Sequence, residues 1–257
     1  MLVTIIGSGN VATVLAKGLL QKGHTISQVF SRNADHAREL AQIVKAASIT
    51  DLSLINRDSD LYLLAVSDEA LPIVAGQLFL PDKLVVHTAG SVSKEVLQTV
   101  TDRYGVLWPM KMIRKSMDTL GTVSIVVDGN TEVVMKEVEK LANLFSPTVA
   151  QANDSQRLKM HMLAAFTANF SNHLYHLAAD YCEKEQIDFS LFYSIIEETA
   201  HAIQAAHPQA LQAGPAFRGD RQTVEKHLQL LAPYPEIQKI YKGMTESLYA
   251  YFGNNQG

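Results

Sequence analysis

A glycine-rich turn lies near the start of the chain and directly follows a short apolar run. Residues 7–12 read Gly-Ser-Gly-Asn-Val-Ala, a G-x-G-x-x-A pattern. In this pattern Gly7 permits a tight turn from strand to helix, and Gly9 lets the backbone approach a pyrophosphate. Free N–H groups at the start of the following helix favour such an anion. The sequence therefore predicts a dinucleotide site, with a plain strand–helix turn as the alternative. The predicted site comprises Gly7, Ser8, Gly9, Asn10 and Val11.

The end of the next predicted strand indicates which dinucleotide the site prefers. Sites for NAD usually place Asp or Glu here, where the carboxylate binds the ribose 2′-hydroxyl. The chain has Ser31 and Arg32 instead, and a hydroxyl beside a guanidinium suits a 2′-phosphate. We therefore expect NADP(H) as the cofactor. The alternative is that Arg32 is a solvated residue that stacks on adenine.

Two further strand ends carry polar residues that we expect near the same ligand. The run Leu61–Val66 leads into Ser67 and Asp68, and a later run ends at His87. Open α/β sheets bind ligands at the carboxyl ends of their strands. We therefore place Val66, Ser67 and His87 near the ribose or the nicotinamide. Ser67 or Asp68 could instead cap a helix, and His87 could simply hold its turn.

A second group of polar residues falls on a long predicted helix. From residue 160 to 179 the chain has no Lys, Arg, Asp or Glu, so we expect this helix to be covered on most sides. One face is apolar, with Leu163, Phe166, Phe170, Leu174 and Leu177. The opposite face carries a neutral stripe of His161, Ala165, Asn169, Asn172 and His176. Such a stripe suits a substrate cleft or a dimer interface, and a partly solvated face without chemistry is the alternative.

Three residues are our candidates for chemistry on a substrate. His161 is the expected acid–base residue because imidazole titrates near neutral pH. Asn169 would orient a carbonyl or imine. Arg218 lies in the constrained segment Gly214–Asp220 and would bind a carboxylate or phosphate, while Asp220 caps the next helix. His173 and His176 have no Asp or Glu beside them or between them in the sequence, so no metal site is expected.

The elements that must position these residues fall into two groups. Residues 1–150 alternate apolar runs with helical stretches, which is typical of a parallel sheet covered on both faces. The expected strands are Leu2–Ile6, Thr25–Phe30, Leu61–Val66, Leu84–His87 and Val123–Val127, and the expected helices are Val11–Lys22, Ala34–Lys45 and Glu69–Leu78. Residues 151–257 show only helical patterns, at Asn153–Lys184, Phe189–Ala206, Gln222–Leu231 and Glu236–Phe252. The predicted fold is an α/β Rossmann domain with a mostly parallel sheet, followed by an all-helical domain, with a cleft between them.

Composition narrows the classes of function. The chain of 257 residues carries a formal net charge of −4, which gives no basic surplus for binding nucleic acid. It lacks an apolar run of about 18 residues, so we expect no membrane span. It also shows no signal peptide, and its single cysteine, Cys182, fits a reducing cytoplasm. The apolar helical half favours a homodimer.

Three motifs together resemble a known family. Gly7–Ala12, the His87-Thr-Ala-Gly-Ser segment and the Gly-Pro-x-x-Arg-Gly-Asp segment ending at Asp220 are similar to those of NADP oxidoreductases with a Rossmann-like domain and a C-terminal domain of unknown function. The chain more distantly resembles pyrroline-5-carboxylate reductases, ketopantoate reductases and β-hydroxyacid dehydrogenases. This resemblance implies an all-α second domain like the C-terminal domain of 6-phosphogluconate dehydrogenase.

The resemblance also bears on the catalytic residues. β-Hydroxyacid dehydrogenases carry a catalytic lysine before an asparagine on the first long helix, and Asn169 matches that asparagine. Lys159 lies off the polar stripe, and His161 occupies it. We therefore expect an NADP-dependent oxidoreductase for a small acidic carbonyl, imine, hydroxy or amino substrate held between the domains. The alternatives are a non-catalytic NADP(H)-binding sensor or scaffold, and a protein that uses a deazaflavin.

Overall fold

The computed structural model describes residues 1–253, which form two compact units. The first unit is Met1–Phe170 and the second begins at Ser171. The last strand ends at Gln151, next to the expected domain boundary, but the first unit continues through α5 (Asp154–Ala164) and a π-helical segment, η3 (Ala165–Phe170).

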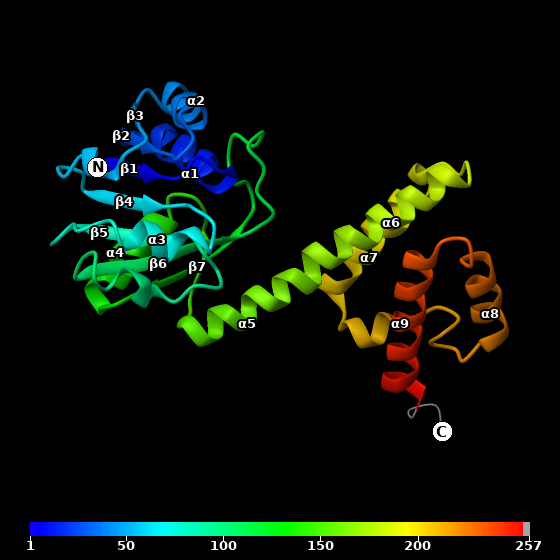
Figure 1. The fold of residues 1–257 in the computed structure, drawn as a ribbon. Helices are drawn as coiled ribbons and strands as arrows, with labels where there is room; N and C mark the ends of the chain where they lie inside the picture. The colour runs from blue at the N-terminus through cyan, green and yellow to red at the C-terminus, as the bar shows by residue number, and fades with distance from the viewer. Residues whose placement is uncertain (254–257) are drawn as a thin grey trace. The chain divides into compact units, whose positions relative to one another are not determined.

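The first unit is built on one sheet, which has eight strands within the described residues and the order β3-β2-β1-β4-β5-β6-β7-β8 (Figure 1). Its strands are β1 (Leu2–Ile6), β2 (Thr25–Phe30), β3 (Ala47–Ile49), β4 (Leu61–Leu64), β5 (Leu84–His87), β6 (Arg103–Met110), β7 (Ser124–Gly129) and β8 (Thr148–Gln151). Among the strand pairs of residues 1–253, only β6–β7 is antiparallel. The order reverses between β1 and β4, and in open α/β sheets the ligand crevice lies at such a reversal.

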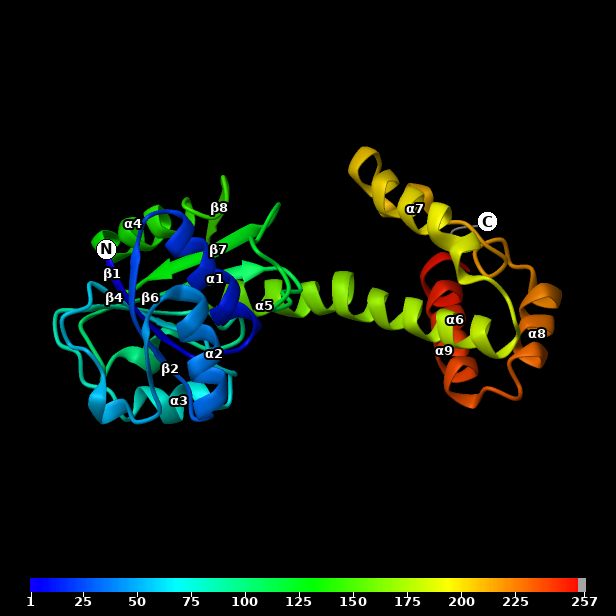
Figure 2. The same ribbon diagram turned by 90° about the horizontal axis from the view of Figure 1, so that it is seen from above.

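Both faces of this sheet are covered, as the apolar runs predict. Val3 and Ile5 of β1 pack into one core with α1 (Asn10–Gln21), α2 (Ala34–Val44) and α4 (Glu132–Ala142). Ile6 and the alternate residues of β4 pack into a second core with α3 (Ala70–Ala75). In Figure 2, α3 and α4 lie on opposite sides of the sheet. The Rossmann-like fold with a mostly parallel sheet is confirmed.

A glycine and an asparagine mark two helix ends in the first unit. Gly23 follows α1 with a left-handed φ of +82°, which a glycine adopts without strain. Asn33 caps α2 by accepting the N–H groups of Asp35 and His36. Neither Ser67 nor Asp68 caps α3, because its N-cap position is Glu69 and no side chain bonds there. Asp68 instead accepts a hydrogen bond from Ser91.

Three strands and one α-helix of the first unit were not predicted. β3 has only three residues, β6 contains a glycine and a proline, and β8 is largely exposed, so none of them reads as a continuous apolar run. The helix α4 does carry a signal that the prediction missed. Val134, Val138 and Leu141 are buried at spacings of four and three residues, and Thr131 caps the helix.

The second unit is helical throughout its described residues, as predicted. Its helices are α6 (Ser171–Lys184), α7 (Tyr193–Ala205), α8 (Arg221–Leu230) and α9 (Pro235–Phe252), with short 3-10 segments at η4 (Phe189–Phe192) and η5 (Pro208–Leu211). Asp220 caps α8 by accepting the Thr223 N–H, as expected. His227 Nδ1 lies 2.7 Å from the Tyr241 hydroxyl and joins α8 to α9.

Residues 160–179, which carry no Lys, Arg, Asp or Glu, are more exposed to solvent than predicted. Within a single chain Leu163 and Phe170 are 53% and 54% exposed. The first unit therefore leaves these two side chains uncovered. Within residues 1–253, no helix combines the length and the apolar character that crossing a membrane requires.

Candidate functional site

The glycine-rich turn requires glycine at two positions for two reasons. Gly7 has a φ of +126°, and an ideal Cβ there would lie 2.2 Å from the Ala65 carbonyl oxygen. Its N–H donates to the Phe30 carbonyl at 2.8 Å, which ties the turn to β2. At Gly9, the N-cap of α1, an ideal Cβ would have no atom within 4 Å. The turn therefore leaves open space where the predicted phosphates would approach the helix.

A cavity of about 310 Å³ lies beside this turn, and we call it the nucleotide cavity. It is lined by Gly7, Ser8, Gly9, Phe30, Ser31, Arg32, Asn33, His36, Ala65, Val66, Ser67, Ala70 and Val74. The Ser8 and Ser31 hydroxyls are hydrogen-bonded at 2.9 Å. Within residues 1–253, Arg32 forms no ion pair with a carboxylate. Its guanidinium is thus available for an anion, as a 2′-phosphate site requires.

A second cavity of about 310 Å³ continues along the strand ends, and we call it the strand-end cavity. It shares Gly9, Ala65, Val66 and Ser67 with the nucleotide cavity. Its lining is Gly9, Asn10, Val11, Ala65, Val66, Ser67, Asp68, Thr88, Ala89, Gly90, Trp108, Pro109, Lys111 and His161. The first turn of α1 and the histidine of α5 therefore face the same space, although about 150 residues separate them in sequence.

A third and larger cavity of about 510 Å³ lies along α5 and η3, and we call it the helix cavity. Its lining comprises Trp108, Met110, Lys111, Met112, Met160, His161, Leu163, Ala164, Ala165, Thr167, Ala168 and Asn169. Trp108, Lys111 and His161 line the strand-end cavity as well. The helix cavity is mainly apolar, and it brings His161 and Asn169 together.

The π-helical segment explains why these two side chains share a cavity. In a regular α-helix, eight residues would leave Asn169 about 80° around the axis from His161. The wider turns of a π-helix, with about 4.4 residues each, reduce this offset to about 10° if they begin at Ala165. Single π-helical turns are frequent at functional sites. The sequence placed both residues on one stripe, but it gave no sign of the change in helical pitch that aligns them.

A glycine on the sheet side makes room for the histidine. An ideal Cβ at Gly90 would lie 2.6 Å from Trp108 Cε2 and 2.7 Å from His161 Cδ2. The Trp108 and His161 rings lie 5.6 Å apart, between centroids, at 50°. Any residue larger than glycine at position 90 would push one ring away. Gly90 belongs to the His-Thr-Ala-Gly-Ser motif. This motif supported the family resemblance, but the sequence alone did not show that its glycine makes room for two rings.

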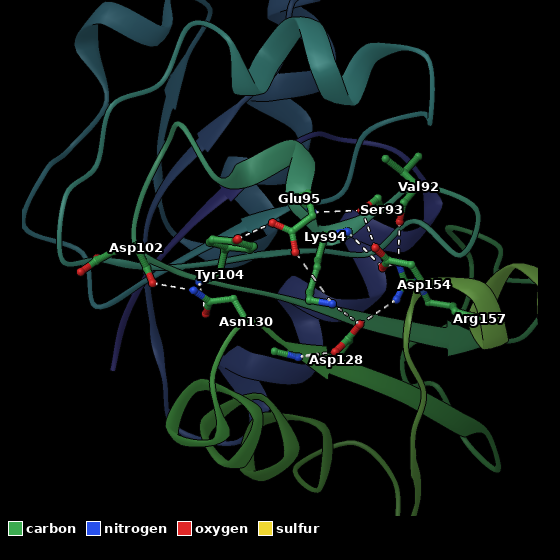
Figure 3. A network of polar contacts seen from close by, with 11 residues as sticks. Val92, Ser93, Lys94, Glu95, Asp102, Tyr104, Asp128, Asn130, Asp154 and Arg157 are labelled. Atoms are coloured by element: carbon green, nitrogen blue, oxygen red, sulfur yellow. Dashed lines mark hydrogen bonds and ion pairs between the residues drawn. The ribbon is translucent and has the colours of Figure 1, made fainter.

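A buried network of charges fixes the first turn of α5 (Figure 3). Arg157 is only 1% exposed, and its guanidinium donates to the Val92 carbonyl at 2.6 Å and to Asp154 at 2.5 Å. Asp128 of β7 lies 3.5 Å from Arg157 and accepts from Lys94 at 3.0 Å. These contacts join α5 to β7 and to η2 (Lys94–Leu97), and they set the position of His161 one turn further along.

The same network controls the charge of Asp154. Burial favours the neutral acid and would raise the pKa of this carboxyl, but hydrogen bonds from Ser93 and Arg157 stabilise the carboxylate. The net effect is a lowered pKa, so Asp154 stays ionised beside the Arg157 guanidinium. Sequence reasoning missed Arg157, because an arginine on an amphipathic helix normally faces solvent.

The remaining candidates lie elsewhere. His87 is fully buried and does not line the three cavities, and its Nδ1 accepts the Ala89 N–H at 3.2 Å. It thus holds the turn, which was the alternative for this residue. Lys159 is exposed and lines none of the three cavities. Arg218 belongs to the second unit, where its N–H donates to the Gly214 carbonyl at 3.1 Å.

Comparison with solved structures identifies the family. A Bacteroides fragilis protein, described provisionally as an NADP oxidoreductase, is 34% identical to this chain, with a TM-score of 0.89. The match covers 97% of this chain and 98% of that one. The chain belongs to the NADP oxidoreductase family. NADP(H), predicted from Ser31 and Arg32, is thereby confirmed as the cofactor of the family.

Two protein-family models match this chain, one in its N-terminal part and one in its C-terminal part. Residues 2–90 match "NADP oxidoreductase coenzyme F420-dependent", and residues 123–248 match a domain of unknown function, DUF2520. The predicted resemblance is therefore confirmed. A search of curated proteins finds none with significant sequence similarity.

More distant structures share the fold. A pyrroline-5-carboxylate reductase from Streptococcus pyogenes is 15% identical, with a TM-score of 0.64, and the match covers 97% of this chain and 98% of that one. An imine reductase from Myxococcus stipitatus, solved with NADP+, is 17% identical, with a TM-score of 0.67 and coverage of 99% and 93%. At these identities the likeness establishes the fold alone.

Proposed function

We propose that this chain is an NADP-dependent oxidoreductase that reduces the carbonyl or imine of a small acidic substrate, or oxidises the corresponding alcohol or amine. One observation carries the proposal. Residues of the glycine-rich turn and His161 line one cavity, the strand-end cavity. It shares lining residues with the nucleotide cavity, which contains Arg32, and with the helix cavity, which contains Asn169.

The residues of the nucleotide cavity fit the family's cofactor. The open space at Gly9 would receive the pyrophosphate, and Ser31, Arg32 and His36 would surround the 2′-phosphate. Val66, Ser67, Asn10 and Val11 would border the ribose and nicotinamide. When bound, the nicotinamide supplies or accepts the hydride.

The chain's own residues would position the substrate and move a proton. His161 would hold a proton on its imidazole and donate it to the reduced oxygen or nitrogen. Asn169, on the same cavity wall, would orient the carbonyl or imine by hydrogen bonding. Arg218 stays a candidate for the substrate's acidic group. We include a C=N bond among the proposed substrate types by analogy with the imine reductase and the pyrroline-5-carboxylate reductase that share the fold.

The test is NADPH oxidation against a panel of keto acids and cyclic imines. We expect turnover with at least one acid, and we expect His161→Gln to lower kcat by about 100-fold or more with little change in NADPH affinity. Asn169→Ala should lower turnover less. If His161→Gln keeps wild-type turnover, the assigned role is wrong. If NADPH binds but no member of the panel is reduced, the result favours a sensor or scaffold.

We also propose that two copies of the chain associate. The exposed Leu163 and Phe170 lie in a stretch of helix without formal charge, and large exposed apolar patches mark interaction surfaces. A homodimer would cover these side chains, which the first unit leaves exposed.

A further inference from the structure

Lys111 follows β6 directly and lines both the strand-end cavity and the helix cavity. Its ammonium donates to the Leu120 carbonyl at 2.7 Å and to the Thr122 carbonyl at 3.2 Å. These are neutral acceptors, so they fix the position of the charge without cancelling it. No carboxylate within residues 1–253 forms an ion pair with this lysine.

The loop after β6 is shaped to hold this side chain. Gly121 separates the two acceptor carbonyls and has a φ of +58°, in the left-handed region that glycine favours. An ideal Cβ at Gly121 would lie 3.5 Å from Lys111 Nζ. The chain therefore folds back around the lysine at this residue and presents a carbonyl on either side of it.

The hydrogen-bonding capacity of Lys111 is not exhausted. An ammonium has three donors and no acceptor, and two of the donors are used by the carbonyls. The helix cavity has no acidic residue in its lining, and Lys111 is its only formally charged member apart from whatever proton His161 carries. In the strand-end cavity the acidic residue is Asp68, which is already bonded to Ser91.

The rest of the helix cavity indicates what the anion is attached to. Met110, Met112 and Met160 line it together with Leu163 and Trp108, and methionine side chains adapt to apolar groups of different shape. His161 and Asn169 supply the polar groups on the helical side. A ligand that matches this cavity has an apolar body and a single negative charge.

We propose that Lys111 is the anchor for the carboxylate of an apolar carboxylic acid substrate, such as a branched or cyclic oxo or imino acid. This inference rests on the proposed function, whose substrate class it specifies. It also moves the acid-binding role from Arg218 to a residue of the first unit. The same ammonium chemistry suits the pyrophosphate of the nucleotide, and the test separates the two anions.

The experiment measures binding rather than turnover. Trp108 is the chain's only tryptophan and lines both cavities, so its fluorescence reports occupancy. The full chain is titrated with cyclohexanecarboxylate and with its neutral amide analogue, cyclohexanecarboxamide. A separate titration uses NADPH. We expect the acid to bind about tenfold tighter than the amide, in keeping with a hydrogen bond to a charged group.

Variants assign the preference to its residue. Lys111→Met should abolish the preference for the acid, Lys111→Arg should retain most of it, and both should bind NADPH within about twofold of wild type, because the pyrophosphate lies on the α1 amides. Arg218→Met should keep the preference.

Several results overturn the proposal. The proposal is wrong if wild type does not prefer the acid to the amide, or if Lys111→Met keeps this preference. It is also wrong if Arg218→Met loses the preference, or if Lys111→Met is impaired only in NADPH binding. A wild type that prefers the acid but does not bind NADPH would contradict the proposed function and leave the anchor in place.

Discussion

Gly7 and Gly9 stand two residues apart in one turn, and their replacement by alanine should have different effects. A Cβ at position 7 collides with the Ala65 carbonyl at a positive φ, whereas a Cβ at position 9 meets nothing within 4 Å. We expect Gly7→Ala to lower the free energy of unfolding by about 1–3 kcal/mol or more. Gly9→Ala should keep wild-type stability and lose NADPH affinity by about tenfold or more, because its methyl group occupies the approach of the phosphates.

Chemical denaturation and NADPH titration of both variants check this contrast. Equal stability of Gly7→Ala and wild type would contradict the strained turn. Unchanged NADPH affinity of Gly9→Ala would contradict the placement of the pyrophosphate.

Burial of His87 predicts a dependence of stability on acid. Desolvation, aided by the charge of Arg157, lowers its pKa to about 3, while the unfolded chain keeps the ordinary value of 6.5. Between these values the unfolded state binds the proton more strongly. Above about pH 6.5 the titration of His87 therefore does not change the free energy of unfolding. As pH falls below this value, it lowers that free energy by up to about 1.4 kcal/mol per pH unit.

Replacement by asparagine should remove this slope, since an amide oxygen can still accept the Ala89 N–H. Denaturation of His87→Asn and wild type from pH 7 to pH 4 measures it, with His36→Asn as the exposed control. Parallel stability curves for His87→Asn and wild type would show that the buried histidine does not titrate as described.

The sequence indicates residues of the nucleotide cavity more directly than residues of the helix cavity. Gly7, Gly9 and Arg32 follow a strand at fixed spacings, because the βαβ unit is local in sequence. Lys111 and Arg157 were missed because their roles depend on tertiary contacts. The first needs a loop that folds back at Gly121, and the second needs three acceptors from separate segments.

At the scale of elements, the position of α5 depends on the buried guanidinium of Arg157. Arg157→Met leaves Asp128 and the Val92 carbonyl without that donor, and we expect a loss of about 3–5 kcal/mol in unfolding free energy. Arg38 is the matched control, because it forms the same i,i+3 pair with Asp35 on the surface and contributes little.

Thermal unfolding of Arg157→Met and Arg38→Met compares the two pairs. The Trp108 emission of folded Arg157→Met should also shift, because α5 carries His161 against that ring. Similar melting temperatures for the two variants would contradict the anchoring role of Arg157.

The elements differ in how far the sequence defines them. The strands β1, β2, β4 and β5 were predicted within about two residues, because β1, β4 and β5 are almost entirely buried and β2 is buried at Ile26, Val29 and Phe30, and most of their residues are apolar or β-branched. β6 was missed although it supplies Trp108, because its glycine and proline interrupt the pattern. The π-helical segment carries no residue signal of its own, and it is the element that aligns His161 with Asn169.

At the scale of the whole molecule, the exposed apolar helix predicts self-association. Phe170→Glu places a charge on the face that we expect to be buried between copies, so it should convert a dimer into monomers at micromolar concentration. Sedimentation velocity measures the change, and Glu236→Lys, on α9, serves as a control for altered surface charge. A wild type that sediments as a monomer would contradict this prediction.

The central claim is that the glycine-rich turn binds NADP(H) and that Arg32 selects it over NAD(H). Calorimetric titration of wild type and Arg32→Ala with NADPH and NADH tests this claim most directly. We expect NADPH to bind wild type at least about tenfold more tightly than NADH does. Arg32→Ala should lose this preference because NADPH binds more weakly, while NADH affinity stays unchanged. Absence of binding by wild type, or equal affinity for both dinucleotides, would contradict it.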